Sequence, residues 1–484
     1  MLDFHGGWAE LTYGDDLDLV QSQQLRNLFT FKIKDFMNPK AEPEVVEAFE
    51  DDGETFKMPQ MAYADPAVRN ILGHQRMGSL SLDNYKTIGM RQREIPKEFC
   101  EVNEEVLSGF RSRADQLHLI DSLMEHKHVV DGLGGILQAP PGTGKTVMGA
   151  EIVARMGYRA VILVHKEFLL RQWLKAFEMV APKLKVCVVA GNKTKFNDAH
   201  VCIAMAQKVV SEKFQERAKP EFWTNWGVVM ADETHRYGAR KWQQCLTTFS
   251  APYRFGLTAT PRRKDGTTKL FKYHIGPVLV VGEGALLTPK VKRVYYTGAY
   301  KIPQWMKEFD GVAWKVKMTK FDNLLVKRHD RNAIILEQIM AAWGAGRKIL
   351  VLTSRREHGE MIKAQVEKAV SLRTVDPPNV YLYFGAMKKA EYLEAEEKGD
   401  VIVGTYQMAQ EGLDIPKLDV LVMATPRGDV EQPVGRILRD HPFKPDPVVV
   451  DVIDTSVKEC VSMFNNTRRR IYQRLGCVVG KIEA

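Results

Sequence analysis

The chain of 484 residues holds little cysteine and no long apolar segment. Its six cysteines include no Cys-x-x-Cys pair, so the sequence predicts neither a zinc site nor a disulfide framework. Cys187, Cys202 and Cys245 lie in apolar strand or helix patterns, which is typical of reduced thiols in a cytoplasm. No run of about 18 or more apolar residues occurs, which excludes a membrane-spanning helix. The opening MLDFHGGWAEL has no basic segment followed by an apolar one, so we expect no secretory signal.

The charged residues are also unevenly distributed along the sequence. The net charge is +9, yet residues 1–100 hold 17 acidic side chains against 11 basic ones. The basic excess therefore lies in the remaining residues. Such an excess favours a polyanionic partner, with a solvated basic surface as the plain alternative.

Residues 134–146 read GGILQAPPGTGKT, and this stretch carries the strongest signal in the chain. Ile136 and Leu137 end a predicted buried strand, and a helix is predicted from Val147. The loop between them matches a phosphate-binding loop, with Ala139 in place of the first glycine of the general pattern. A simple Gly/Pro turn is the alternative, which GTGKT between a strand and a helix disfavours. The sequence thus predicts a bound nucleoside triphosphate.

The residues of this loop are expected to play different roles in binding the nucleotide. The glycines let backbone N–H groups turn towards a polyphosphate at the positive end of the following helix. Lys145 is expected to reach the β- and γ-phosphates, and the Thr146 hydroxyl is expected to bind Mg²⁺. The predicted nucleotide-binding residues here are Pro141, Gly142, Thr143, Gly144, Lys145 and Thr146.

A second polar cluster follows the predicted strand Val228–Ala231, where the chain reads Asp232-Glu233-Thr234-His235. A carboxylate at the carboxyl end of a strand, beside a phosphate-binding loop, is where a Mg²⁺-binding acid is expected. Asp232 would hold the metal, and Glu233 would orient and deprotonate the attacking water. Because acidic turns after strands are common, the signal lies in the order and spacing of the two motifs.

Strand and helix patterns alternate from the phosphate-binding loop onward, which predicts parallel α/β structure. A second such pattern begins near Val291 without a second phosphate-binding loop, and residues 297–322 are expected to be an irregular insertion. This insertion contains two tryptophans and no recognisable motif.

Two more polar stretches follow predicted strands. The first, FGLTATP, contains Thr258 and Thr260, whose hydroxyls could link the nucleotide site to a second ligand. The second, QPVGRILR, would place Arg436 and Arg439 on one face of a helix. Arginines offered to a transferring phosphoryl group stabilise its charge. Two solvated arginines on a surface helix are the alternative.

Taken together, these stretches resemble a superfamily 2 helicase of the DExH type, over roughly Gln116 to the C-terminus. APPGTGKT is similar to motif I, VHKEFLLRQW (164–173) to motif Ia, DETH to motif II and TATP to motif III. GTYQMAQEGLDIP (404–416) is similar to motif V, and QPVGRILR to motif VI. Within the superfamily, FGLTATPRRKDG (255–266) and IGPVLVV (275–281) resemble phage UvsW-type and XPB-type DNA helicases. DEAD-box RNA helicases carry DEAD and SAT instead.

The resemblance implies an α/β fold of two tandem RecA-like parallel-sheet lobes with an N-terminal α+β accessory domain. The expected bounds are 1–105 for the accessory domain, 106–288 for lobe 1 and 289–484 for lobe 2. Within the accessory domain, short strands are expected at Phe4–Tyr13 and Leu28–Ile33. Its acidic balance argues for positioning of branched DNA rather than for binding through phosphates.

The resemblance also assigns roles at matched positions. A side-chain amide can read the edge of adenine, so Gln116 is expected to contact that base, although an ordinary surface glutamine is the alternative. The expected sets are catalytic Glu233, Lys145, Arg436, Arg439 and Gln432; Asp414 at the ATP site; coupling residues His235, Thr258 and Thr260; and nucleic-acid contacts Lys166, Gln207 and Thr405.

The implied function is that of an ATP-dependent DNA helicase using ATP and Mg²⁺. It would act on single-stranded and branched DNA without sequence preference, in fork remodelling or branch migration. The alternatives are a duplex translocase that never separates strands, an RNA helicase, and a non-catalytic ATP-binding scaffold. Lys145, Glu233 and Arg436 together disfavour the scaffold. We expect a monomer without a membrane partner, in the cytoplasm of a prokaryote or of a phage-infected host.

Overall fold

The chain divides into two compact units, which are described separately. The first comprises Met1–Ala139 and Gly144–Glu283, and the second comprises Pro140–Thr143 and Gly284–Ala484. The computed structural model describes residues 3–5, 7–33, 42–73, 93–102, 113–190, 196, 198–263, 265–282, 287–309, 313–371, 377–385, 387–411, 413, 415–438 and 444–480. No helix among them is long and apolar enough to span a bilayer.

A seven-stranded sheet, parallel throughout, forms the centre of the first unit, in the order β13-β7-β12-β11-β8-β10-β9. The strands are β7 (Gly135–Gln138), β8 (Ala160–Val164), β9 (Val186–Val189), β10 (Val201–Met205), β11 (Val228–Asp232), β12 (Tyr253–Thr258) and β13 (Val278–Val281). The helices are α6 (Arg113–Met124), α7 (Lys127–Val130), α8 (Lys145–Met156), α9 (Glu167–Val180), α10 (Ala206–Val209), α11 (Glu212–Gln215), α12 (Pro220–Thr224), η4 (Thr234–Gly238), α13 (Arg240–Thr247) and α14 (Thr268–Ile275).

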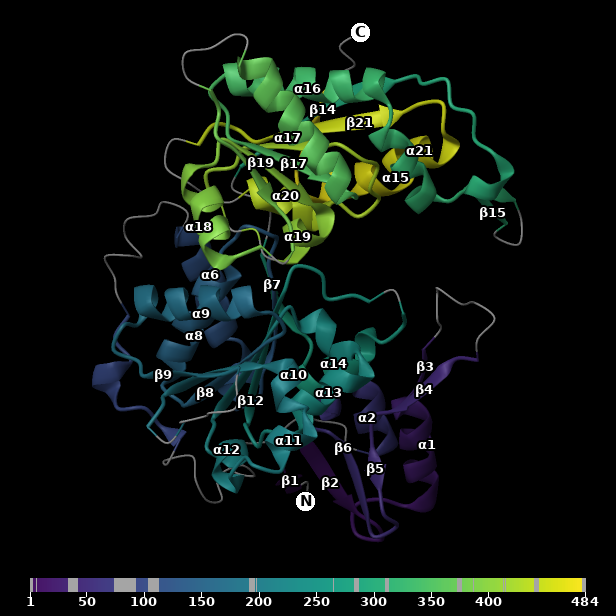
Figure 1. Cartoon of the computed structure of the whole chain (residues 1–484). Coiled ribbons are helices and arrows are strands. Elements are labelled where there is room, and N and C mark those ends of the chain that lie inside the picture. Colours follow the sequence, from purple (N-terminus) through teal and green to yellow (C-terminus); the bar gives the residue numbers. More distant parts are fainter. Residues whose placement is uncertain are drawn as a thin grey trace. The chain divides into compact units, whose positions relative to one another are not determined.

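Both faces of this sheet are covered by helices, as Figure 1 shows for α8 and α9 on one side and α13 and α14 on the other. Alternate residues of a strand point to opposite faces, and the core follows that rule. Ile162 packs in a cluster with residues of α8 and α9, whereas its neighbours Val161 and Leu163 pack with residues of α13 and α14. Burial on both faces explains the continuous apolar runs of these strands.

The N-terminal region forms a four-stranded antiparallel sheet, β1-β2-β6-β5, with a separate β3-β4 pair. Its elements are β1 (Asp3–His5), β2 (Trp8–Thr12), α1 (Leu19–Phe29), β3 (Thr30–Ile33), β4 (Glu44–Glu47), β5 (Glu50–Asp51), β6 (Thr55–Pro59), η1 (Gln60–Ala64), α2 (Pro66–Ile71) and η3 (Lys97–Phe99). The strand predicted at Leu28–Ile33 was too long, because its first two residues belong to α1. A capping box of Asp18 and Gln21 starts that helix.

This region shares its core with the rest of the first unit. Leu270 and Tyr273 of α14 lie in one hydrophobic cluster with Phe29 and Phe56. The fully buried Arg254 of β12 donates through Nε to Gln60 Oε1 at 2.9 Å. The N-terminal sheet is therefore packed as a continuation of the first unit (Figure 1).

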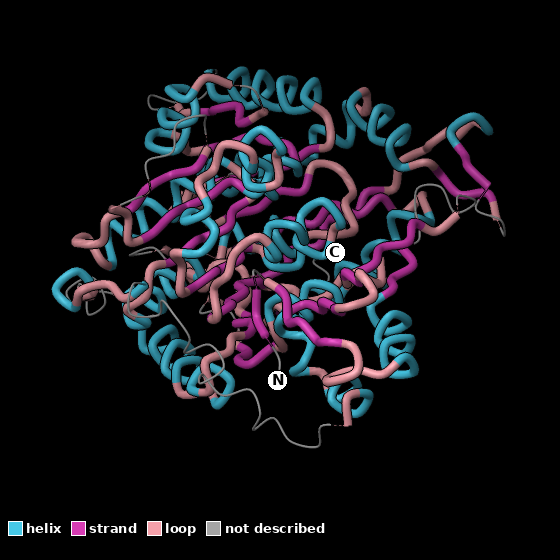
Figure 2. Tube along the Cα trace, turned by 90° about the horizontal axis from the view of Figure 1, so that it is seen from below, coloured by secondary structure: helices cyan, strands magenta, loops and turns pink. Residues whose placement is uncertain are grey.

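The second unit holds another seven-stranded parallel sheet, in the order β18-β19-β17-β20-β21-β14-β22. Its strands are β14 (Lys290–Tyr296), β17 (Ile349–Thr353), β18 (Val380–Tyr383), β19 (Val401–Thr405), β20 (Val420–Met423), β21 (Val448–Asp454) and β22 (Val478–Val479). Its helices are α15 (Met318–Val326), α16 (His329–Gly344), α17 (Arg356–Ser371), α18 (Lys389–Lys398), α19 (Tyr406–Glu411), α20 (Glu431–Ile437), α21 (Lys458–Ser462), the π-helical η6 (Met463–Arg468) and α22 (Arg469–Arg474). Figure 2 marks the strands of the chain in magenta and its helices in cyan.

The two parallel sheets confirm the predicted α/β fold of two tandem RecA-like lobes with an N-terminal sheet region. The expected irregular insertion is partly regular. It contains η5 (Gln304–Met306) and an antiparallel hairpin of β15 (Lys307–Phe309) and β16 (Trp314–Val316), and it runs into α15.

Candidate nucleotide-binding and hydrolysis site

The carboxyl ends of the strands gather the predicted residues of the first unit at one edge. Because the sheet is parallel, β7, β11 and β12 all end there. β7 leads into the phosphate-binding loop, Asp232 ends β11, and Thr258 ends β12. Ligands of open α/β sheets bind at this edge.

The phosphate-binding loop has the backbone that its glycines predict. Gly142 and Gly144 have φ of 88° and 76°, a region that favours glycine. Helix α8 begins at Lys145, so its first N–H groups are open to an anion together with the positive end of the helix. Lys145 Nζ donates to the carbonyl oxygen of Ala139 at 3.0 Å, which holds the ammonium over the loop.

Gln116 lies against the same loop. Its side chain is 9% exposed, and its Nε2 lies only 2.4 Å from the position that a Cβ on Gly144 would take. A side chain at position 144 would have to displace the end of the Gln116 side chain. The structure thus brings the predicted base-reading amide next to the predicted phosphate site.

Asp232 is a buried carboxylate with two fixed donors. Its Oδ2 accepts from Trp173 Nε1 at 2.9 Å, and its Oδ1 accepts from the backbone N–H of Glu233 at 2.9 Å. Burial and the neighbouring charge of Glu233 raise the pKa of Asp232 to about 6. Sequence reasoning missed Trp173, although it closes the VHKEFLLRQW stretch. The indole fixes the orientation of the carboxylate.

Glu233 has φ of 50°, and it is the one non-glycine residue with positive φ in the part of the chain that the structure describes. Such strain is retained where the surroundings fix it, and it clusters at functional sites. His235 Nδ1 lies 3.5 Å from Glu233 Oε2 and 3.0 Å from Thr258 Oγ1. Thr258 Oγ1 also accepts from the backbone N–H of Thr260 at 3.2 Å. The three predicted coupling residues therefore form one chain of contacts that begins at Glu233.

Burial lowers the pKa of His235, which keeps its imidazole neutral near pH 7. A neutral imidazole donates from one nitrogen and accepts at the other. The ring can therefore form its hydrogen bond with Thr258 without placing a positive charge beside Glu233.

Sequence reasoning also missed Arg263, which forms a hydrogen bond that holds the backbone of His235 in place. Its Nη1 donates to the carbonyl oxygen of His235 at 2.7 Å, and its Nε donates to Thr267 Oγ1 at 2.7 Å. It also forms an ion pair with Asp265. Burial acts to raise the pKa of Asp265, but hydrogen bonds from Arg263 and Thr267 hold it at about 2. The signal was present in TATPRRKDG, where an arginine and an aspartate follow the threonines.

Two predicted nucleic-acid contacts lie at the same sheet edge. Lys166 is the N-cap residue of α9, just after β8. Gln207, after β10, donates through Nε2 to the carbonyl oxygen of His165 at 2.7 Å. This bond ties together the ends of neighbouring strands. In the second unit, Thr405 ends β19, and its hydroxyl accepts from the N–H of Met408 at 3.4 Å.

The arginine helix of the second unit is shorter than predicted. Helix α20 ends at Ile437, and Arg439 and Asp414 lie outside the described residues. Arg436 Nε donates to the carbonyl oxygen of Ala409 at 2.6 Å, which joins α20 to α19. Gln432 Oε1 is buried and has no hydrogen-bond partner among the described residues.

The residues of the site suit Mg²⁺ bound together with phosphate and water, and they do not suit a metal ion bound by side chains alone. Among the described residues, no group of three or more His, Cys, Asp or Glu could hold a metal ion. Asp232 and Thr146 are the two residues predicted to offer oxygens to Mg²⁺ beside the phosphate-binding loop. Mg²⁺ in such sites takes one or two protein oxygens, and phosphates and water complete its shell.

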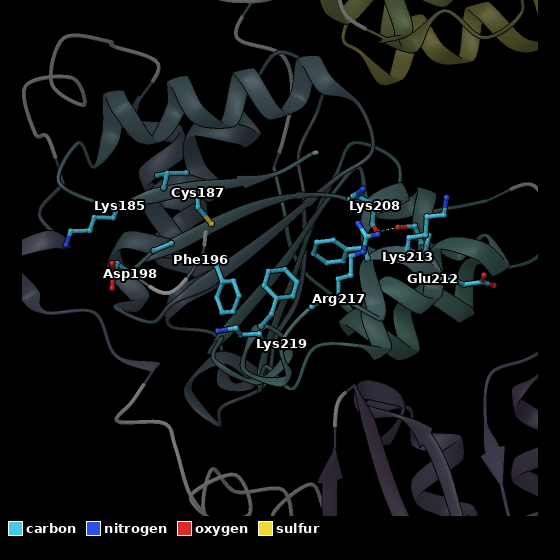
Figure 3. A pocket seen from close by; sticks show the side chains of 16 residues that line it. Lys185, Cys187, Phe196, Asp198, Lys208, Glu212, Lys213, Arg217 and Lys219 are labelled. Carbon is cyan, nitrogen blue, oxygen red and sulfur yellow. Dashed lines mark hydrogen bonds between the residues drawn. The ribbon is translucent and has the colours of Figure 1, made fainter. Parts of the chain in front are cut away.

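A cavity of about 1250 Å³ in the first unit lies away from this site (Figure 3). Its lining includes Lys185 and Cys187 of the β9 segment and Arg217 and Lys219 near α12, and no residue of the phosphate-binding loop. The nucleotide site is therefore identified by its chemistry rather than by the size of a cavity.

Comparisons with known proteins agree with this fold. A family model described as "Type III restriction enzyme, res subunit" matches residues 109–263. The protein L396 of Acanthamoeba polyphaga mimivirus, which carries the provisional name ATP-dependent RNA helicase, is 30% identical over 355 residues. The match covers 72% of this chain, and the chain spans 65% of the length of that relative.

The structure described as "S. cerevisiae Dbp5 bound to RNA and ADP BeF3" matches 79% of this chain and 95% of its own, with a TM-score of 0.52 and 13% identity. T4 UvsW aligns over 99% of both chains at 16% identity with a TM-score of 0.35, a value that supports no structural argument.

The fold and the phosphate-binding loop define a protein of two tandem RecA-like lobes. Its sequence is similar to that of a mimivirus protein named as a helicase, and membership of helicase superfamily 2 stays a prediction. The DExH subtype and the UvsW-type or XPB-type resemblance stay predictions.

Proposed function

We propose that this chain is an ATP-dependent helicase or translocase that acts on nucleic acid. One observation carries the proposal. The loop lysine, the buried Asp232, the strained Glu233 and the His235–Thr258 contact lie together at the carboxyl edge of one sheet. A scaffold that only binds ATP would not need Glu233 in a strained conformation beside a neutral histidine.

In the proposed reaction, the chain's own residues bind and orient ATP. Gln116 contacts the adenine, and the loop N–H groups and Lys145 hold the phosphates. Thr146 and Asp232 would hold Mg²⁺, which supplies positive charge to the β- and γ-phosphates. Glu233 orients the attacking water and takes its proton.

Arg436 of the second lobe is proposed to stabilise the charge on the transferred phosphoryl group. Hydrolysis would then change contacts to the phosphate in both lobes. His235, Thr258 and Thr260 would pass the change to the strand ends that carry Lys166 and Gln207. Those residues are proposed to contact the nucleic-acid backbone, with Thr405 doing so in the second lobe.

For the substrate, we propose branched DNA, gripped without sequence preference. The support is the similarity of FGLTATPRRKDG to UvsW-type and XPB-type DNA helicases, together with an N-terminal sheet that is too acidic to bind by bulk charge. RNA is the second candidate. It is favoured by the name of the mimivirus relative, an RNA helicase, and by the RNA bound to Dbp5 in its structure.

The test measures ATP hydrolysis and strand separation on single-stranded DNA, forked DNA, four-way junctions and RNA duplexes at one salt concentration. Glu233→Gln serves as the control, because it keeps the fold and removes the base. The proposal expects stimulation by DNA and the highest activity on branched substrates. Stimulation by RNA alone would replace the DNA proposal, and hydrolysis that no nucleic acid stimulates would refute the helicase proposal.

A further inference from the structure

The hairpin of the second unit, β15 and β16, presents aromatic rings on one face. Its register places Phe309 opposite Trp314, and their ring centroids lie 5.6 Å apart. Directly opposite residues of an antiparallel pair project from the same face. Lys307 and Val316 share that face, because they lie two residues further along each strand.

These rings are exposed to solvent. Phe309 is 53% exposed and Trp314 is 58% exposed, and Trp305, just before the hairpin, is 62% exposed. One exposed apolar side chain needs no explanation, but three large aromatic side chains within a short segment indicate an interaction surface.

Hydrogen bonds and apolar contacts join the base of the hairpin to the rest of the second unit. The N–H of Val316 donates to Glu459 Oε1 at 2.7 Å, and the N–H of Lys317 donates to the carbonyl oxygen of the buried Met306 at 2.8 Å. Val316 also packs against the cluster that contains Phe321. These contacts hold the two strands that carry the rings to the second unit.

The charge around the hairpin indicates which partner fits. Among the described residues of 297–327, the carboxylates are Glu308 and the buried Asp322. The lysines there are Lys301, Lys307, Lys315, Lys317, Lys320 and Lys327. Lys320 Nζ lies 5.2 Å from the ring centroid of Trp305. Aromatic rings among lysines match unpaired nucleic acid, whose bases stack while its phosphates meet the positive charges.

We propose that the β15–β16 hairpin binds unpaired nucleobases, which stack on Phe309 and Trp314. The inference rests on the proposed function, since it takes nucleic acid as the substrate. It adds a contact to bases, whereas Lys166, Gln207 and Thr405 are proposed to contact the backbone. A strand that is held by its bases is a strand that has left its duplex, so the hairpin would favour strand separation over plain duplex translocation.

The test compares two oligonucleotides of about 16 residues, one of thymidine and one abasic, which carry the same phosphate charge. The full chain is used at matched salt. The wild type should bind the thymidine oligonucleotide at least tenfold more tightly, equal to about 1.4 kcal/mol. Phe309→Ala with Trp314→Ala should abolish this preference and leave abasic binding and unstimulated ATP hydrolysis unchanged. Leu393→Ala, at a residue 53% exposed on α18, is the matched control and should keep the preference.

The outcomes separate the two proposals. Phe309→Tyr with Trp314→Phe should keep the preference, because the rings remain. A double alanine variant that still prefers thymidine would overturn the hairpin proposal and would assign the surface to a protein partner. A wild type that binds both oligonucleotides equally would overturn it too, with nucleic-acid binding intact. A chain that binds neither oligonucleotide would refute the proposed DNA substrate, and with it the hairpin proposal.

Discussion

His274 should make the first unit sensitive to acid. The imidazole is fully buried on α14, neither ring nitrogen has a hydrogen-bond partner among the described residues, and its ring lies edge-on to Trp8. Burial, together with the nearby cation of Arg254, lowers the pKa of His274 to about 3. Its ordinary value is 6.5.

The sign of the effect follows from these two values. Below pH 6.5 the unfolded chain takes up a proton on this ring, whereas the folded chain stays neutral down to about pH 3. Proton uptake therefore lowers the free energy of the unfolded state as the pH falls, and the fold loses stability across that window. Each pH unit below 6.5 costs about 1.4 kcal/mol, so the loss at pH 5 is about 2 kcal/mol.

His274→Phe removes the titrating group and keeps an aromatic ring. Urea unfolding of both proteins at pH 7.5 and pH 5 measures the difference between the two pH-dependent losses. The wild type should lose about 2 kcal/mol more than the variant. A packing defect in the variant would act equally at both pH values and would cancel. Equal losses for the two proteins would show that His274 is not held neutral by burial.

Three substitutions test the hydrolysis site. Lys145→Ala should weaken both ATP binding and hydrolysis, measured by nucleotide titration and phosphate release, and wild-type affinity would contradict its contact with phosphates. Arg436→Ala should leave ATP affinity nearly unchanged and lower turnover by roughly 10³-fold; an equal fall in affinity would point to a structural role through Ala409. Arg263→Lys keeps the charge but cannot bond His235 and Thr267 together, so turnover should fall about tenfold at unchanged ATP affinity. Unchanged turnover in Arg263→Lys would remove it from a positioning role.

Local patterns were enough to predict the sheet and the phosphate-binding loop. The strands of the first unit are apolar runs that end in polar motifs, so both their positions and their functional ends can be read from the sequence. The helix that starts at Lys145 follows from the same motif. The strands, the loop and this helix could be predicted because each depends on residues that are close together in the sequence.

Contacts between distant residues could not be read in the same way. Trp173 reaches Asp232 across 59 positions, and Gln60 reaches Arg254 across 194. Nothing local in the sequence indicated that the N-terminal sheet packs against α14. The expected accessory domain, 1–105, stays a prediction, and the structure shows that its sheet shares a hydrophobic cluster with α14 of the first unit.

The most direct test of the central claim is the rate of ATP hydrolysis by the wild type and by Glu233→Gln, with and without single-stranded DNA. A motor that uses this site should hydrolyse ATP faster when DNA is present. The variant should bind ATP with nearly the affinity of the wild type and hydrolyse it very slowly in either condition. Hydrolysis by Glu233→Gln at the wild-type rate, or a wild-type rate that DNA leaves unchanged, would contradict the account.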